Sequence, residues 1–120
     1  MRKRPRCPRL SKALALGGGW ITFDGRLVET RAGIAAAAAR RWDDAERYFG
    51  MARKVAEQMS NRLELADLHR LHARMLLDRG GTGDDARAAE MLERALAAYH
   101  DFGMPAYAAE AERLRGQALA

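Results

Sequence analysis

The chain has 120 residues, with 21 basic and 16 acidic side chains and a formal net charge of +5. A chain of this length forms one domain and buries about two-thirds of its unfolded surface, which leaves no room for a second domain. Its single cysteine, Cys7, excludes an internal disulfide, so a reducing cytoplasm is the expected location. No apolar run approaches the ~20 residues of a membrane-spanning helix, so we expect a soluble protein.

The positive charge is concentrated at the start of the chain. Six of the 21 bases lie within residues 1–12, where no acid occurs, which leaves 15 bases and 16 acids in the remainder. Two prolines and the lack of apolar periodicity predict that these twelve residues are disordered. Residues 13–25 contain three consecutive glycines and are predicted to be irregular, with the segment Trp20 to Phe23 packed on the first helix. The predicted division is a leader over residues 1–25 and a helical domain over 26–120.

The first two predicted helices follow the Asp24-Gly25 turn. One covers residues 26–40, and apolar side chains nearly encircle its alanine-rich second half, which indicates neighbours on both sides. Asp43, with Glu46 three residues later, is the expected N-cap of a second helix that ends near Gln58.

A third helix is predicted after Ser60 or Asn61, either of which can act as its N-cap. Glu64 lies three residues after Asn61 and is placed to complete a capping box with it. Leucine and methionine recur at spacings of three and four, and Gly80 is expected to end the helix.

Two more helices complete the chain. Asp84 or Asp85 is expected to cap a fourth helix that runs to Asp101, with Gly103 as its terminator. Pro105 suits the first turn of a fifth helix, because its missing N–H has no partner there in any case. This fifth helix carries an apolar stripe and is predicted to close the domain.

A helical motif of spacing i, i+4, i+7 occurs twice in the chain. The first copy is Ala45, Phe49 and Ala52, and the second is Ala88, Leu92 and Ala95. Each copy follows a turn rich in Asp or Gly and a preceding apolar helix. The chain therefore reads as repeated helix-turn-helix units, which are typical of binding surfaces.

These residues resemble the tetratricopeptide repeat, in which small residues on paired helices allow a close crossing. Gly33 and Ala73 stand where that family has a small residue on the first helix of each unit. The likeness covers residues 26–115, with departures at Glu29, where an aromatic residue is usual, and in a period of 40 to 43 residues. It implies an all-α superhelix of two helix pairs and a closing helix.

The closing phrase FGMPAYAAEAERL is similar to the carboxyl-terminal repeats of large bacterial ATP-binding transcriptional regulators and multidomain adenylate cyclases. This resemblance implies a sensing or assembly module attached to such a protein, with a protein or peptide as partner. If the family geometry holds, Asp67, Arg70 and Arg74 share the inner face of the third helix. The two arginines can then fork onto a partner carboxylate. The alternative is an ordinary exposed face with a weak Asp67–Arg70 pair.

The domain is expected to need a neighbour, since two repeats and a cap lie near the lower limit for a free-standing solenoid. We expect the alanine-rich first helix to dock on upstream repeats of a longer parent chain, on Trp20 to Phe23, or on a second copy. A rival hypothesis is nucleic-acid binding through the basic arm, from Arg2 to Lys12, although the near-neutral body makes it the less favoured.

The chain shows no pattern that indicates an enzyme. The sequence shows no recognisable arrangement of residues that would activate a nucleophile. Neither glycine-rich stretch is followed by the Lys-Ser/Thr pair of a phosphate-binding loop. His69 and His72 lie three apart, but no Cys cluster or HExxH pattern accompanies them. We therefore expect neither a catalytic site nor a metal or cofactor site.

Overall fold

A computed structural model describes residues 26–120, which form five α-helices. The helices are α2 (Val28–Ala38), α3 (Trp42–Gln58), α4 (Arg62–Arg79), α5 (Asp84–Phe102) and α6 (Pro105–Leu119). The prediction of an all-α fold is confirmed for this part of the chain. The predictions made for residues 1–25, including the basic arm, lie outside the described residues.

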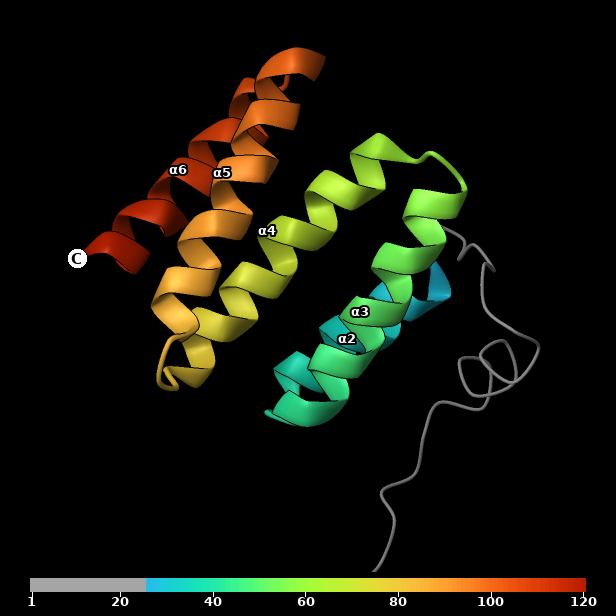
Figure 1. The fold of residues 1–120 in the computed structure, drawn as a ribbon, viewed down its shortest axis with the longest axis vertical. Coiled ribbons are helices and arrows are strands. Elements are labelled where there is room, and N and C mark those ends of the chain that lie inside the picture. The colour runs from blue at the N-terminus through green and yellow to red at the C-terminus, as the bar shows by residue number, and fades with distance from the viewer. Residues whose placement is uncertain (1–25) are drawn as a thin grey trace, which may run out of the picture.

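The helices are arranged as consecutive antiparallel neighbours around α4 (Figure 1). α3 packs against α2 and α4, and α5 packs against α4 and α6. α4 also touches α2 and α6, so it is in contact with every other described helix, whereas α3 and α5 do not pack directly on each other. The structure measures 38 × 33 × 20 Å, and its shortest dimension is that of two helix layers of about 10 Å each.

The crossings between paired helices are lined by small residues. All eight residues of the repeat motif are buried: Gly33, Ala45, Phe49, Ala52, Ala73, Ala88, Leu92 and Ala95. At the crossing of α2 and α3, a Cβ placed on Gly33 would lie 2.6 Å from Cδ1 and Cε1 of Phe49. Because carbon atoms cannot approach so closely, the Phe49 ring occupies the space that a larger residue at position 33 would need.

The helix ends defined by glycine and proline agree with the sequence. Gly80 and Gly103 adopt left-handed conformations after α4 and α5, with φ of 66° and 64°, and Pro105 is the first residue of α6. Asn61 is the N-cap of α4, since its side chain accepts a hydrogen bond from the Glu64 N–H at 3.1 Å. Among the helices of residues 26–120, none has both the length and the apolar character of a membrane span.

The predicted bounds of the first helix were too wide. α2 begins at Val28 because Leu27 is extended, and its N–H donates to the Glu64 carboxylate at 3.1 Å. The helix ends at Ala38, and Arg40 turns the chain with a φ of 57°.

Three predicted capping interactions were wrong, each because the acid has another partner or position. α3 begins at Trp42 with Arg41 as N-cap, so Asp43 does not cap it, and Glu46 binds side chains of α4 and α5. Glu64 does not return to Asn61, because it accepts hydrogen bonds from the start of α2. The N-cap of α5 is Gly83, and neither Asp84 nor Asp85 takes that position.

We predict that Gly33→Ala destabilises the fold by about 1–3 kcal/mol, although alanine is the better helix former, because its Cβ would overlap the Phe49 ring. Gly116→Ala is the matched control, since Gly116 lies inside α6 with no atom near its Cβ position. That change should stabilise the protein by about 0.5–1 kcal/mol. Urea unfolding followed by circular dichroism measures both, and equal effects would contradict the close-approach argument.

Candidate functional site

The three residues predicted to bind a partner lie on one side of α4 but differ in exposure. Asp67 is buried, Arg70 is mostly buried and Arg74 is exposed. We call this side of α4, with the adjoining side of α6, the inner face. Its residues used below are Asp67, Arg70 and Arg74 on α4 and Tyr107 and Glu110 on α6.

Asp67 and Arg70 are held by a tyrosine of α5. The Tyr99 hydroxyl donates to Oδ1 of Asp67 at 2.5 Å and accepts from Nε of Arg70 at 3.0 Å. Arg70 Nη2 also lies 3.6 Å from Asp67 Oδ1, and Arg26 Nη1 lies 3.3 Å from Asp67 Oδ2. Burial is the main cause that raises the pKa of Tyr99, with the hydrogen bond to Asp67 next, so its hydroxyl stays a donor.

A second buried carboxylate joins α2 to α4. Glu64 Oε2 accepts a hydrogen bond from the Thr30 hydroxyl at 2.7 Å and from the Leu27 N–H at 3.1 Å. Arg26 Nη1 lies 3.6 Å from Glu64 Oε1. Arg26 is therefore shared between Glu64 and Asp67, so the start of α2 is bound to two successive turns of α4.

The remaining residues of the inner face are accessible to a partner. Tyr107 is 41% exposed, its ring lies 5.4 Å below the Arg70 guanidinium, and it stacks on Tyr99 at 5.5 Å. Glu110 accepts hydrogen bonds from Arg113, which is the main cause that lowers the pKa of Glu110. Arg74 makes no hydrogen bond or ion pair with a described residue. The structure thus places Asp67 and Arg70 in internal contacts, while Arg74 is exposed and acts on Glu110 only through its charge.

On the opposite side of α4, Glu46 of α3 is the centre of an ionic cluster. Its carboxylate lies 2.6 Å from Nε2 of His72, 3.0 Å from Nη2 of Arg87 and 3.3 Å from Nη2 of Arg79. The hydrogen bond from Arg87 is the main cause that lowers the pKa of Glu46, to about 2. His72 is 1% exposed and stacks on Phe49, with ring centroids 5.4 Å apart. The cluster joins α3, α4 and α5 where α3 and α5 do not pack together.

A third acid stabilises the turn before α5. Asp84 accepts the Gly81 N–H at 2.9 Å and two hydrogen bonds from Arg79, each 2.8 Å long. The bonds from Arg79 are the main cause that lowers the pKa of Asp84 to about 2. Arg79 therefore connects this turn to Glu46.

Sequence reasoning missed Tyr99 and the role of Glu46. Tyr99 lies four residues after Ala95, so it continues the apolar face of the second motif, and a buried tyrosine hydroxyl needs a partner. That signal could have identified Tyr99 as the partner of a polar residue on α4. Glu46 lies three residues before Phe49 and so shares its buried side, which favours an ion pair over capping.

Other predicted binding surfaces are placed as follows. Ala35 and Ala38 of α2 and its C-cap Ala39 are exposed, and docking through them stays a prediction. In the described part of the chain, no group of three or more His, Cys, Asp or Glu side chains is arranged to hold a metal ion. His69 and His72 are both buried on α4, and the His72 ring stacks on Phe49 of α3.

Comparison with known proteins identified no related protein. No protein-family model matches the chain, and neither a curated protein nor a solved structure matches it. The likeness to tetratricopeptide repeats and to the tails of bacterial regulators therefore stays a prediction from the residues.

We predict that Tyr99→Phe lowers the free energy of unfolding by about 1–3 kcal/mol, because the buried Asp67 carboxylate loses a donor. Tyr107→Phe is the control, since its hydroxyl belongs to an exposed side chain, and it should change stability by less than ~0.5 kcal/mol. Urea titrations of both variants provide the measurement. A loss in Tyr107→Phe as large as that in Tyr99→Phe would refute the role given to the buried hydroxyl.

Stability should fall on mild acidification because His69 is buried as the neutral form. Burial is the main cause that lowers its pKa to about 4, and Arg53 and Arg94 add to it. An unfolded histidine takes up its proton near pH 6.5, so the unfolded state binds more protons between pH 6.5 and 4. The stabilisation is complete above pH 6.5 and is lost as the pH falls toward 4.

We expect a loss on the order of 2 kcal/mol between pH 6.5 and 5 from this histidine. His69→Gln should remove this part of the loss, and the pH dependence that remains belongs to His72, whose pKa burial also lowers. Glu46 contributes little to this window, because its lowered pKa makes it lose stabilisation only from about pH 4.5 down to 2. An unchanged profile in His69→Gln would show that another group titrates.

Proposed function

We propose that this chain is a protein-interaction module that holds a peptide or protein partner on the inner face of α4 and α6. The observation that carries the proposal is that the inner face exposes both the guanidinium of Arg74, which forms no hydrogen bond or ion pair with a described residue, and the aromatic ring of Tyr107. Arginine and tyrosine are the residue types that contribute most to protein interfaces. An exposed guanidinium can form two parallel hydrogen bonds to a carboxylate of the partner.

The internal contacts of the inner face support this function by fixing its shape. Arg70 is restrained by Asp67 and Tyr99, and its guanidinium lies over the Tyr107 ring. The Arg70 charge and the Tyr107 ring beside the binding arginine's helix face are therefore held in place before a partner arrives, which reduces the entropy that these two side chains lose on binding. Glu110 is hydrogen-bonded by Arg113 and acts on Arg74 only through its charge, so the donors of Arg74 stay open to an acid of the partner.

We also propose that the fold is a tetratricopeptide-like stack at the carboxyl-terminal end of a bacterial signalling or transcription-regulatory ATPase or cyclase. Support comes from the alternation of helix pairs α2/α3 and α4/α5, and from the close contact of Gly33 with Phe49. The segment FGMPAYAAEAERL, which is similar to the carboxyl-terminal repeats of such proteins, forms the end of α5, the turn and most of α6. In such a parent, upstream repeats would cover the exposed alanines of α2.

The module is tested through Arg74, because Arg70 also holds Asp67 and Tyr99 and its replacement would disturb the fold. A photoreactive amino acid at Tyr107, compared with one at Met51 on α3, identifies the partner in cells by crosslinking. We predict that Arg74→Glu then weakens binding of that partner at least tenfold in calorimetry, with an unchanged melting temperature. Lys54→Glu, an equal charge change at an exposed site of α3, should bind normally. Equal affinities for both variants would rule out the inner face.

A further inference from the structure

The side of α4 that faces away from the proposed binding surface carries a second group of basic residues. At about 100° per residue, His69 and His72 lie roughly 160° around α4 from the inner-face residues Asp67, Arg70 and Arg74. This outer face is flanked by α3 and α5, which approach it from either side (Figure 1). We define the outer face by Glu46 and Arg53 of α3, His69 and His72 of α4, and Arg87 and Arg94 of α5.

One end of the outer face is electrostatically complete. The Glu46 carboxylate lies between His72 and the guanidinium of Arg87, with Arg79 as a third partner. A carboxylate from α3 thus satisfies a histidine of α4 and an arginine of α5. Because α3 and α5 do not pack together, these side-chain contacts across α4 are what join them here.

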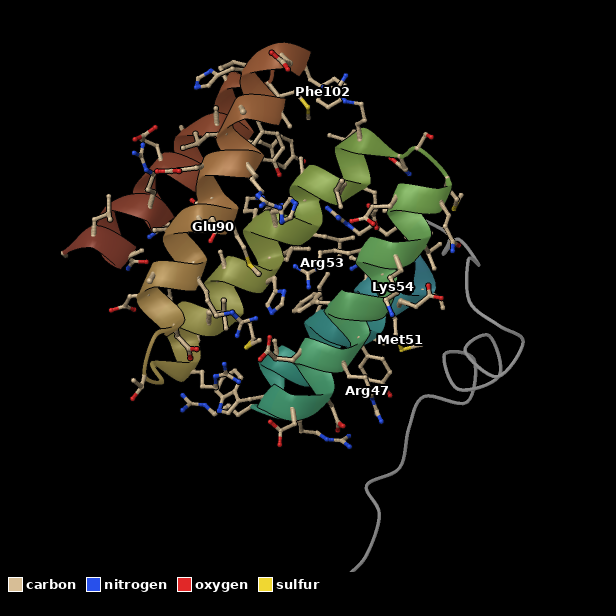
Figure 2. The ribbon with its side chains drawn as sticks, in the orientation of Figure 1. Arg47, Met51, Arg53, Lys54, Glu90 and Phe102 are labelled. Atoms are coloured by element: carbon tan, nitrogen blue, oxygen red, sulfur yellow. The ribbon has the colours of Figure 1, made fainter. Side chains whose placement is uncertain are left out.

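Further along the same three helices, the corresponding polar side chains are Arg53, His69 and Arg94. Figure 2 shows Arg53 directed from α3 toward α4, whereas Arg47 and Met51 lie on the other side of α3. Both Arg53 and Arg94 act electrostatically on His69, and Arg53 also acts on His72. The three helices contribute one polar side chain each, as they do in the Glu46 cluster, but α3 here contributes Arg53 in place of the acid Glu46.

The group of Arg53, His69 and Arg94 contains two positively charged side chains and almost no negative charge to offset them. Arg53 forms no ion pair or hydrogen bond within residues 26–120. Arg94 contacts Glu90 at 3.3 Å, but both side chains are about two-thirds exposed, where such a pair contributes little. His69 is 8% exposed and forms no hydrogen bond within residues 26–120, whereas His72 is bonded to Glu46 through Nε2 and lacks a partner only at Nδ1. The positive potential is therefore left for an external anion to satisfy.

We propose that Arg53, His69 and Arg94 form a binding site for a carboxylate, supplied by an acidic side chain of a peptide partner. The class of ligand follows from the neighbouring cluster, in which a carboxylate fills the equivalent place between a histidine and an arginine. The two guanidinium groups donate hydrogen bonds to the carboxylate oxygens. His69 responds to the added negative charge by taking up a proton more readily. The site is separate from the inner face and would be a second point of contact.

The test follows the His69 imidazole by NMR in the full-length protein, with glutarate as the probe. Glutarate should raise the pKa of His69 by about one pH unit relative to sodium chloride at equal ionic strength, since a nearby anion favours the charged ring. Inorganic phosphate is titrated in parallel, and a tetraglutamate peptide should act at lower concentration than glutarate.

Arg53→Gln and Arg94→Gln should each reduce the response to glutarate, and the double variant should abolish it. Lys54→Gln is the matched control, because Lys54 is exposed, adjacent in sequence and outside the outer face. Arg74→Glu should also leave the response intact, which separates this site from the inner face. The proposal is overturned if glutarate acts no differently from chloride, if the double variant still responds, or if phosphate alone moves the pKa of His69.

Discussion

The central position of α4 is the constraint on which the rest of the structure depends. This helix contacts all four other described helices, yet it carries ionisable residues on opposite sides. Burying an unpaired charge costs several kcal/mol, so each buried carboxylate on α4 must find a partner on a neighbouring helix, whereas a buried histidine can instead stay neutral, as His69 does. Asp67 is satisfied by Tyr99 of α5 and Glu64 by the start of α2, while His72 is satisfied by Glu46 of α3. These contacts fix which turn of each neighbour lies against which turn of α4.

Hydrogen bonds and ion pairs are important for the arrangement of these helices because the residues where paired helices cross are small and bury little apolar area. Five of the eight motif residues at the crossings are fully buried alanines, and each alanine removes little apolar surface from water. Phe49 and Tyr99 are the largest fully buried side chains, and each lies where a polar group of α4 meets a neighbouring helix. Close backbone approach and ring stacking therefore accompany the same hydrogen bonds that set the register.

The sequence predicted what depends on local chemistry. Gly80, Gly103 and Pro105 mark helix ends correctly because their backbone preferences act within one or two residues. The all-α class follows from apolar spacing of three and four, which likewise needs no distant information.

What the sequence did not predict depends on contacts between distant residues. Glu46 and Glu64 have the spacing of capping residues, but partners 26 to 41 residues away bind Glu46, and Glu64 binds a residue 37 positions earlier. Spacing also placed Asp67 and Arg70 on one face without revealing that Tyr99 lies over them. Whether a polar residue is buried, and which residue it contacts, depends on the tertiary structure. A local pattern can therefore predict on which side of a helix a residue lies, but not which distant residue packs against that side.

The two sides of α4 share a feature that bears on binding. On each side a hydrogen-bonded cluster lies beside an arginine that forms no hydrogen bond or ion pair with a described residue: Arg74 beyond Asp67 and Arg70, and Arg53 beyond Glu46 and His72. The satisfied cluster holds the backbone and the neighbouring rings in place, so an anion that reaches the free arginine meets a rigid surface. Because little side-chain entropy remains to be lost around it, such an arginine is better suited to bind a partner than one whose donors are taken by an adjacent glutamate, as those of Arg113 are by Glu110.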